Sequence, residues 1–213
     1  KLGVQTRMVQ GRRVTDASAI DATSMVLNGL INTQLVALCR SFGISAIGIG
    51  GIDGGLVQAH RRAPVTLASG EVVDYGLVGD IDGIDGTVVT RLLDSGFLPV
   101  VSPLSCDSSG QLLNINADTV AAAIGGVLVA EKLILCTGAP GILERVDDPQ
   151  SLISYTDLAG LHRLREKGAI TDGMLPKSSA IEAAIRGGVR RVHVISYAET
   201  DSLLAEIFTN EGK

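Results

Sequence analysis

Apolar positions recur along the chain with two different periods, which predicts helices interleaved with strands. Between Ile20 and Leu38 the apolar residues follow helical spacing, and Thr15 or Asp16 can cap the start of this helix. Short apolar runs beside glycines predict buried strands at 44–49, 97–101, 133–136 and 191–196.

Further helices are expected between these strands. Their predicted ranges are 87–93, 117–130, 157–167, 176–186 and 202–208. A turn at Ser69-Gly70 joins two short β-rich pieces and indicates a hairpin. Strands that alternate with helices favour an α/β fold, with a mainly parallel sheet covered on both faces.

Composition places the chain among soluble globular proteins. It has 213 residues, 46% of them apolar and 19% charged, with a mean hydropathy of +0.33. The longest apolar run, Val120 to Ala130, is too short to span a bilayer, and residues 1–11 lack the apolar core of a signal peptide. A net charge of −5 argues against a nucleic-acid partner. We therefore expect a cytoplasmic protein with neither membrane nor nucleic-acid contacts.

The cysteines and histidines argue against disulfides and against a metal site. Cys39, Cys106 and Cys136 are odd in number and widely scattered, which is typical of reduced thiols. The three histidines show no metal-ligand spacing with them, so no zinc site is expected.

The common nucleotide-binding fingerprints are absent from the sequence. The run that begins at Gly48 has Asp53 where the third glycine of a dinucleotide-binding motif belongs, and no Gly-Lys-Ser/Thr loop occurs. Two segments in the first half could still bind a ligand. Arg12 and Arg13 precede a helix and could grip a carboxylate or phosphate, or could be a solvated surface pair. Asn114 and Asn116 share one face of an extended segment, although Asn116 or Asp118 could simply cap the next helix.

Two segments of the second half suit an anionic ligand. The turn from Cys136 to Leu143 follows a predicted parallel strand, and ligands bind outside the carboxyl ends of such strands. The loop from Ala169 to Leu175 enters a helix whose N-terminal amides favour anions, and Lys177 lies in its first turn. A plain loop and a surface lysine are the alternatives.

Taken in order, these segments resemble the acetylglutamate kinases, a branch of the amino acid kinase family. The matching stretches are GRRVTDASAID, NGLIN, GIGGIDGGL, LPVVSPLSCDSSGQLLNINAD, APGIL, GAITDGMLPK and EIFTNEG. They cover essentially the whole chain in collinear order, and NINAD followed by TDGMLPK is the most specific pair.

The resemblance implies a three-layer αβα sandwich with a mainly parallel central sheet and two lobes. Residues 1–131 would bind the acyl amino acid and form a homodimer through the helix from Asp16 to Cys39, and residues 132–213 would bind ATP. The implied reaction transfers a phosphoryl group from ATP, with Mg²⁺, to the side-chain carboxylate of N-acetyl-L-glutamate in arginine biosynthesis.

The resemblance also implies roles for individual residues. Lys177 and Asp118 would be catalytic, and Arg13, Asn114 and Asn116 would bind the substrate. The nucleotide would be bound by Gly138, Ala139, Pro140, Gly141, Ile142 and Leu143, together with Ala169, Ile170 and Thr171.

The chain also departs from the family pattern. The strand that bears Lys-x-Gly-Gly in the family, with one catalytic lysine, has no match, so an incomplete chain of impaired activity is expected. Gly138 stands where many members carry Asp, and Asp201 stands where arginine-sensitive members are expected to carry His. Alternative functions are a kinase of N-succinylglutamate or of carrier-linked aminoadipate or glutamate, and a non-catalytic nucleotide-binding paralogue. Control by arginine stays open.

Overall fold

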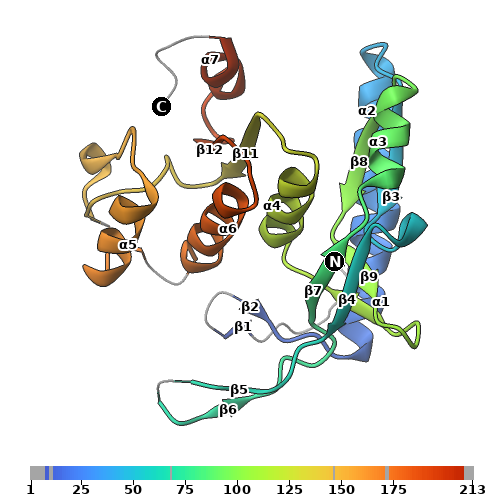
Figure 1. The fold of residues 1–213 in the computed structure, drawn as a ribbon, viewed down its shortest axis with the longest axis horizontal. Coiled ribbons are helices and arrows are strands. Elements are labelled where there is room, and N and C mark those ends of the chain that lie inside the picture. Colours follow the sequence, from blue (N-terminus) through green and yellow to red (C-terminus); the bar gives the residue numbers. More distant parts are fainter. Residues whose placement is uncertain (1–7, 10–11, 68, 146, 171–172, 209–213) are drawn as a thin grey trace. The chain divides into compact units, whose positions relative to one another are not determined.

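The protein consists of two compact units, Lys1–Val120 and Ala121–Lys213, described here one at a time. The structure is a computed structural model that describes residues 8–9, 12–67, 69–145, 147–170 and 173–208 (Figure 1). The division falls inside helix α4 (Ala117–Val127). The functional lobes expected from the sequence remain a prediction.

A long helical segment spans residues 17–41 of the first unit. It comprises α1 (Ala17–Ser24), the π-helical turn η1 (Met25–Ile31) and α2 (Asn32–Ser41). Asp16 caps α1, because its carboxylate accepts the backbone N–H of Ala19 at 2.8 Å. One of the two capping residues expected from the sequence is thereby confirmed.

Asn32 attaches this helix to a pair of parallel strands, β3 (Ala46–Gly50) and β8 (Leu98–Ser102). Its side-chain amide donates to the carbonyl of Val100 at 2.8 Å and to that of Ile49 at 3.4 Å. A Cβ at Gly48 would lie 1.8 Å from the Asn32 Oδ1, so only glycine allows this approach. Helix α3 (Thr87–Asp94) leads into β8.

The helical run from Ala17 to Ser41 is 25 residues long and is apolar enough to cross a membrane by length and composition. Its asparagines, however, bind the sheet of the same unit: Asn32 contacts β3 and β8, and the Ser102 hydroxyl donates to the Asn28 Oδ1. The helix therefore belongs to the folded unit, and its apolar character gives only weak support for a membrane span.

A mixed sheet forms the rest of the first unit. It contains β10 (Leu112–Asn114), β9 (Leu104–Cys106), β4 (Val57–Arg61) and β7 (Gly79–Ile84) in that order. The outer pairs are antiparallel and β9 meets β4 in parallel. The smaller elements are β1 (Met8–Val9), β2 (Arg12–Arg13), η2 (Asp53–Gly55), β5 (Val65–Thr66) and β6 (Val72–Val73). The hairpin expected around Ser69-Gly70 is confirmed as the antiparallel pair β5–β6.

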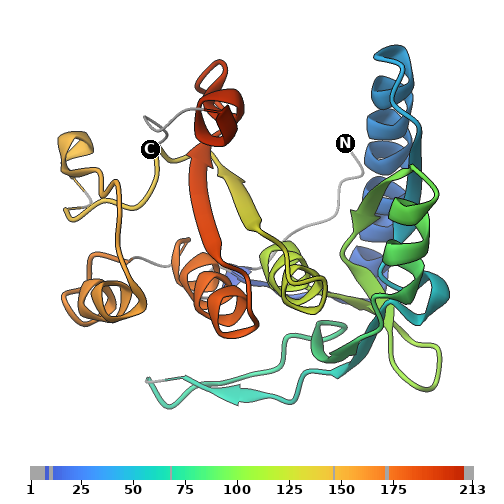
Figure 2. The same ribbon diagram turned by 45° about the horizontal axis from the view of Figure 1, so that its top comes forward.

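The second unit is built on two parallel strands, β11 (Lys132–Thr137) and β12 (Arg191–Ser196). Figure 2 shows α4 and α6 (Leu175–Arg186) beside these strands. Their core contains Ala122, Ala180, Ala184 and Val189, with Leu133 and Val192 packed against it. The remaining elements are η3 (Pro149–Ser151), α5 (Leu158–Glu166) and α7 (Ser202–Phe208).

Candidate active site

In the first unit, two predicted substrate-binding segments meet through Thr15. The hydroxyl of this fully buried residue accepts the side-chain amide of Asn114 at 3.2 Å, across 99 positions of sequence. Arg13 lies two residues before Thr15, at the end of β2. The structure thus brings the Arg13 and Asn114 segments together, as a shared binding site requires.

A turn at positions 74–78 supports both segments. Its backbone forms two hydrogen bonds with Thr15. The Thr15 N–H donates to the Tyr75 carbonyl at 3.0 Å, and the Leu77 N–H donates to the Thr15 carbonyl at 2.6 Å. The N–H of Asn114 donates to Leu77 at 2.9 Å. This small backbone network fixes the two segments against each other.

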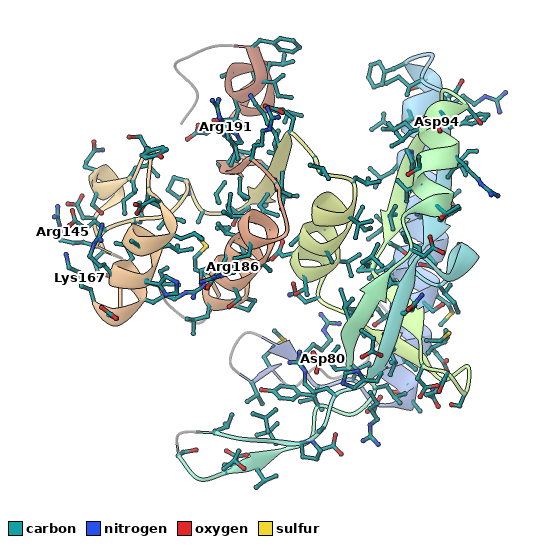
Figure 3. The ribbon with its side chains drawn as sticks, viewed as in Figure 1. Asp80, Asp94, Arg145, Lys167, Arg186 and Arg191 are labelled. Carbon is teal, nitrogen blue, oxygen red and sulfur yellow. The ribbon has the colours of Figure 1, made fainter. Side chains whose placement is uncertain are left out.

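Charged side chains hold this turn in place. The Asp74 carboxylate accepts the N–H of Gly76 at 2.8 Å and the guanidinium of Arg61 at 2.9 Å. The Gly76 hydrogen bond, followed by the charge of Arg61, lowers the pKa of Asp74 below its ordinary value. The next residue, Arg62, pairs with Asp80, which is labelled in Figure 3, and its guanidinium lies 5.8 Å from the centre of the Tyr75 ring.

Arg13 and Asp118 differ in how far they are exposed to solvent. The Arg13 side chain is exposed, and it makes no ion pair with any residue that the structure describes. Asp118 is half-buried in the first turn of α4. An exposed guanidinium and a partly shielded carboxylate would suit a ligand that carries both charge and polar groups.

Asn116 has a structural role that the sequence left open. Its side-chain oxygen accepts the N–H of Thr119 at 3.1 Å, which caps the start of α4. The capping alternative is therefore what the structure shows, and substrate binding by Asn116 stays a prediction.

In the second unit, the predicted loop 138–143 leaves the carboxyl end of β11. Thr137 pairs with Ser196 at the end of β12, and the next residue, Tyr197, donates its N–H to Thr137 at 3.0 Å. The Ala139 N–H points back to the Thr137 hydroxyl at 3.4 Å. The loop thus begins at the carboxyl ends of two parallel strands, which is where ligands bind in such folds.

The two predicted nucleotide loops meet in one apolar cluster. Ile142 from the first loop packs with Ala169 and Ile170 from the second, around Leu161 and Leu164 of α5. Ile170 is only 5% exposed, so its side chain packs into this cluster and is not available to a ligand. Thr171, also predicted to bind the nucleotide, lies outside the described residues.

Lys177 lies half-buried in the first turn of α6, one position after Pro176. Pro suits this position because the first helical residues need no internal N–H bond. The neighbouring Ser178 is fully buried, and its N–H bonds Met174 at 2.8 Å. The structure therefore fixes the backbone that carries Lys177.

A polar bridge that sequence reasoning missed holds α5 to α6. Arg165 donates to the Ser178 hydroxyl at 3.0 Å and to the Glu182 carboxylate at 2.7 Å. Hydrogen bonds from Arg165 and then Arg186, labelled in Figure 3, with the charge of His162, lower the pKa of Glu182. Only the Glu182–Arg186 spacing of four residues could have been seen in the sequence.

Within the described ranges, no group of three or more His, Cys, Asp or Glu side chains could hold a metal ion. The three thiols are free; Cys136 is exposed, and the other two are half-buried. A ligand that brings its own metal would need no such group.

Comparison with known families decides the relationship. Residues 1–196 match the sequence model of the amino acid kinase family. The chain belongs to this family. A curated acetylglutamate kinase from Myxococcus xanthus is 44% identical, over 99% of this chain and 70% of its own length. Enzymes of the same name from Methanopyrus kandleri and Archaeoglobus fulgidus are 44% and 41% identical, and the chain covers 76% and 74% of their lengths.

Solved structures confirm the α/β fold expected from the sequence. An N-acetylglutamate synthase from Neisseria gonorrhoeae, complexed with coenzyme A and N-acetyl-glutamate, has a TM-score of 0.80 at 26% identity, over 99% of this chain and 46% of that one. The smu.665 protein from Streptococcus mutans gives 0.76 at 26% identity, over 91% and 76%. Carbamate kinase from Giardia lamblia, bound to AMP-PNP, gives 0.61 at 13% identity, over 87% and 71%, and shows the fold alone.

Proposed function

We propose that the protein phosphorylates the side-chain carboxylate of N-acetyl-L-glutamate with ATP, as a step of arginine biosynthesis. The observation that carries this proposal is the identity of 40–44% to acetylglutamate kinases over 89–100% of the chain. The product would be N-acetyl-L-glutamyl 5-phosphate.

The first unit would bind the acyl amino acid. The exposed guanidinium of Arg13 can form two parallel hydrogen bonds with a carboxylate. Asn114, held beside this segment by its bond to Thr15, would fix the amide part of the substrate, with Asn116 as a further polar contact. Asp118, close by in α4, would orient the cationic groups of the reaction centre.

The second unit would bind ATP through loops 138–143 and 169–171. Backbone amides at the carboxyl ends of strands and at helix starts favour phosphate oxygens. Mg²⁺ would enter with ATP, since this ion is commonly held by substrate phosphates and water rather than by an all-protein cage. Lys177 in the first turn of α6 would neutralise charge on the transferred group.

The transfer itself needs little covalent help from the protein. An oxygen of the substrate carboxylate forms a bond to the γ-phosphorus while the bond from that phosphorus to the β–γ bridging oxygen breaks, and ADP leaves with the electron pair. Positioning of the two reactants and fixed positive charge lower the barrier. Arg13 and Asn114 would supply the positioning, and Lys177 the charge.

The assembly that we propose is a cytoplasmic homodimer formed through the helix from Asp16 to Cys39. On this helix and its end, Ile31, Leu35, Leu38 and Phe42 form an exposed apolar stripe with helical spacing. Exposed apolar stripes of this kind mark interaction sites, and a second copy would cover this one.

An acyl-phosphate assay tests the reaction. The purified protein is incubated with MgATP and hydroxylamine, and the hydroxamate formed from N-acetylglutamate is compared with that from N-succinylglutamate. We expect preferential turnover of the acetyl substrate. Preferential turnover of the succinyl substrate would support the alternative kinase and overturn the proposed substrate.

A lysine pair tests the catalytic assignment. Lys177→Met should lower kcat by about 10²–10³, the cost of removing one group that stabilises transition-state charge. Lys167→Met, at the exposed end of α5 and labelled in Figure 3, should keep full activity. Equal activity of both variants would remove Lys177 from the mechanism.

A further inference from the structure

Tyr197 lies at the carboxyl ends of the parallel strands β11 and β12 in the second unit. It directly follows β12, and its N–H bond to Thr137 continues the pairing of β11 with β12 by one step. Its backbone is also fixed from the other side: the Ser196 hydroxyl accepts the N–H of Ala198 at 3.2 Å, and the Ser202 hydroxyl donates to the Ser196 carbonyl at 2.9 Å. The position of this residue is therefore set by the strand edge.

The Tyr197 side chain lies across Gly138, the first residue of loop 138–143. A Cβ built on Gly138 would lie 2.9 Å from the Tyr197 hydroxyl and 3.4 Å from the ring carbon that bears it. The three atoms nearest to that Cβ all belong to Tyr197. Gly138 has no unusual backbone angle, so what its missing side chain provides is space for this ring.

The ring is exposed although its backbone is held. The Tyr197 residue is 74% exposed, and its hydroxyl has no hydrogen-bond partner among the described residues. Burying an aromatic ring is favourable, so a ring fixed in solvent at the carboxyl ends of parallel strands is available to a ligand. An aromatic face with a polar tip suits a planar heterocycle better than it suits a phosphate.

We propose that Tyr197 determines nucleotide affinity by stacking on the base of ATP, with its ring held in the space that Gly138 leaves open. This inference rests on the proposed use of ATP and adds the contact that recognises the nucleoside. The triphosphate would be bound by backbone amides and Lys177, and the base would be bound by Tyr197. The pair Gly138 and Tyr197 acts as one unit, because any side chain at 138 displaces the ring.

Calorimetric titration separates the base contact from the phosphate contacts. MgATP and inorganic tripolyphosphate with Mg²⁺ are titrated into the wild type, Tyr197→Ala and Tyr197→Phe. We expect Tyr197→Ala to weaken ATP binding by about 5-fold to 150-fold, the range for removal of one stacked aromatic ring, and to leave tripolyphosphate binding unchanged. Tyr197→Phe should bind ATP within about twofold of the wild type, because it keeps the stacking face.

A matched control and a double-mutant cycle sharpen the test. Tyr155→Ala, at a tyrosine of the same unit that is 86% exposed, should leave both affinities unchanged. Gly138→Ala should weaken ATP binding in the wild-type background, and should have no further effect once Tyr197 is Ala. The three atoms nearest to the new Cβ all belong to the exposed Tyr197 side chain, so this side chain is the group that must move.

The outcomes distinguish this inference from the proposed function. If the wild type binds ATP and Tyr197→Ala binds it equally well, the stacking contact is wrong and the kinase proposal stands. Equal losses for Tyr197→Ala and Tyr197→Phe, or a loss of tripolyphosphate binding in Tyr197→Ala, would also overturn it. A wild type that binds tripolyphosphate but not ATP would overturn both.

Discussion

Asn32 is a polar side chain in the interior of the first unit, where its amide bonds two strand carbonyls and it is 7% exposed. We expect Asn32→Ala to reduce the free energy of unfolding by about 1–3 kcal/mol, because the partly buried Val100 carbonyl loses its amide partner and Gly48 has no side chain to fill the space. Urea unfolding followed by circular dichroism measures this. Gln34→Ala, exposed on the same helix, should stay within about 0.5 kcal/mol of the wild type. Equal stability of both variants would mean that Asn32 does not hold the helix.

Asn116 offers a way to separate a helix cap from a substrate contact. Asn116→Ala should cost about 0.5–2 kcal/mol of stability, because the Thr119 N–H loses its acceptor. Asn116→Asp keeps that acceptor and should keep the stability. If Asn116 also binds the anionic substrate, the added charge should raise KM for N-acetylglutamate while the unfolding transition is unchanged. An unchanged KM would leave Asn116 as a cap alone.

At the scale of elements, the bridge between α5 and α6 predicts a pH dependence. The pKa of Glu182 is lowered by Arg165, Arg186 and His162, so the stabilisation is present above its unfolded-state pKa and is lost as the pH falls through its folded-state value. We expect Glu182→Gln to melt below the wild type at pH 7, with the difference shrinking steadily on acidification.

Thermal melts from pH 7 to acid pH on both proteins measure this convergence. Glu166→Gln, an exposed carboxylate at the end of α5, is the matched control and should follow the wild type at every pH. A difference between Glu182→Gln and the wild type that persists or grows in acid would show that the bridge acts through packing rather than through charge.

The helices were readable from the sequence because their signals are local. Asp157 and Asp16 cap α5 and α1, and apolar spacing gives the long helix from residue 17 to 41. Strands β4 and β7 were not predicted. In the case of β7 the reason is its sequence, Gly-Asp-Ile-Asp-Gly-Ile, which lacks a β-like composition. Pairs such as His60–Asp82 connect these two strands. Their residues are 22 positions apart, so a local sequence pattern cannot predict them.

The roles of the candidate site residues stay predictions from the sequence, whereas the contacts that support these residues could not be read from it. Arg13, Asn114 and Lys177 stood out by type and context. The contacts that hold them, such as the Thr15 hydroxyl and the Arg165 guanidinium, join segments far apart in sequence. Ser178 looks like an ordinary helix residue until Arg165 is seen to bond it. Residue type predicts which groups can react, whereas the fold decides which groups hold them.

At the scale of the whole molecule, the apolar stripe of the long helix is left exposed by its own unit. Ile31, Leu35, Leu38 and Phe42 are between 40% and 73% exposed. The same helix is apolar enough to resemble a membrane span, so either a second copy or a lipid phase could cover it. The asparagines that bind the strands fix one side of the helix to its own unit and favour a protein partner.

A charge in the middle of this stripe tests the homodimer. In a two-fold interface each substitution occurs twice, so Leu38→Asp would bury two carboxylates and should raise the dimer dissociation constant by at least about 100-fold. Light scattering coupled to size exclusion, over a range of protein concentrations, gives the masses. Leu204→Asp, at a similarly exposed leucine of α7, should remain dimeric. A wild type that is monomeric at every concentration would contradict the dimer. A dimer that survives in Leu38→Asp would place the interface elsewhere, because two uncompensated carboxylates cannot be buried at that stripe without a measurable loss of affinity.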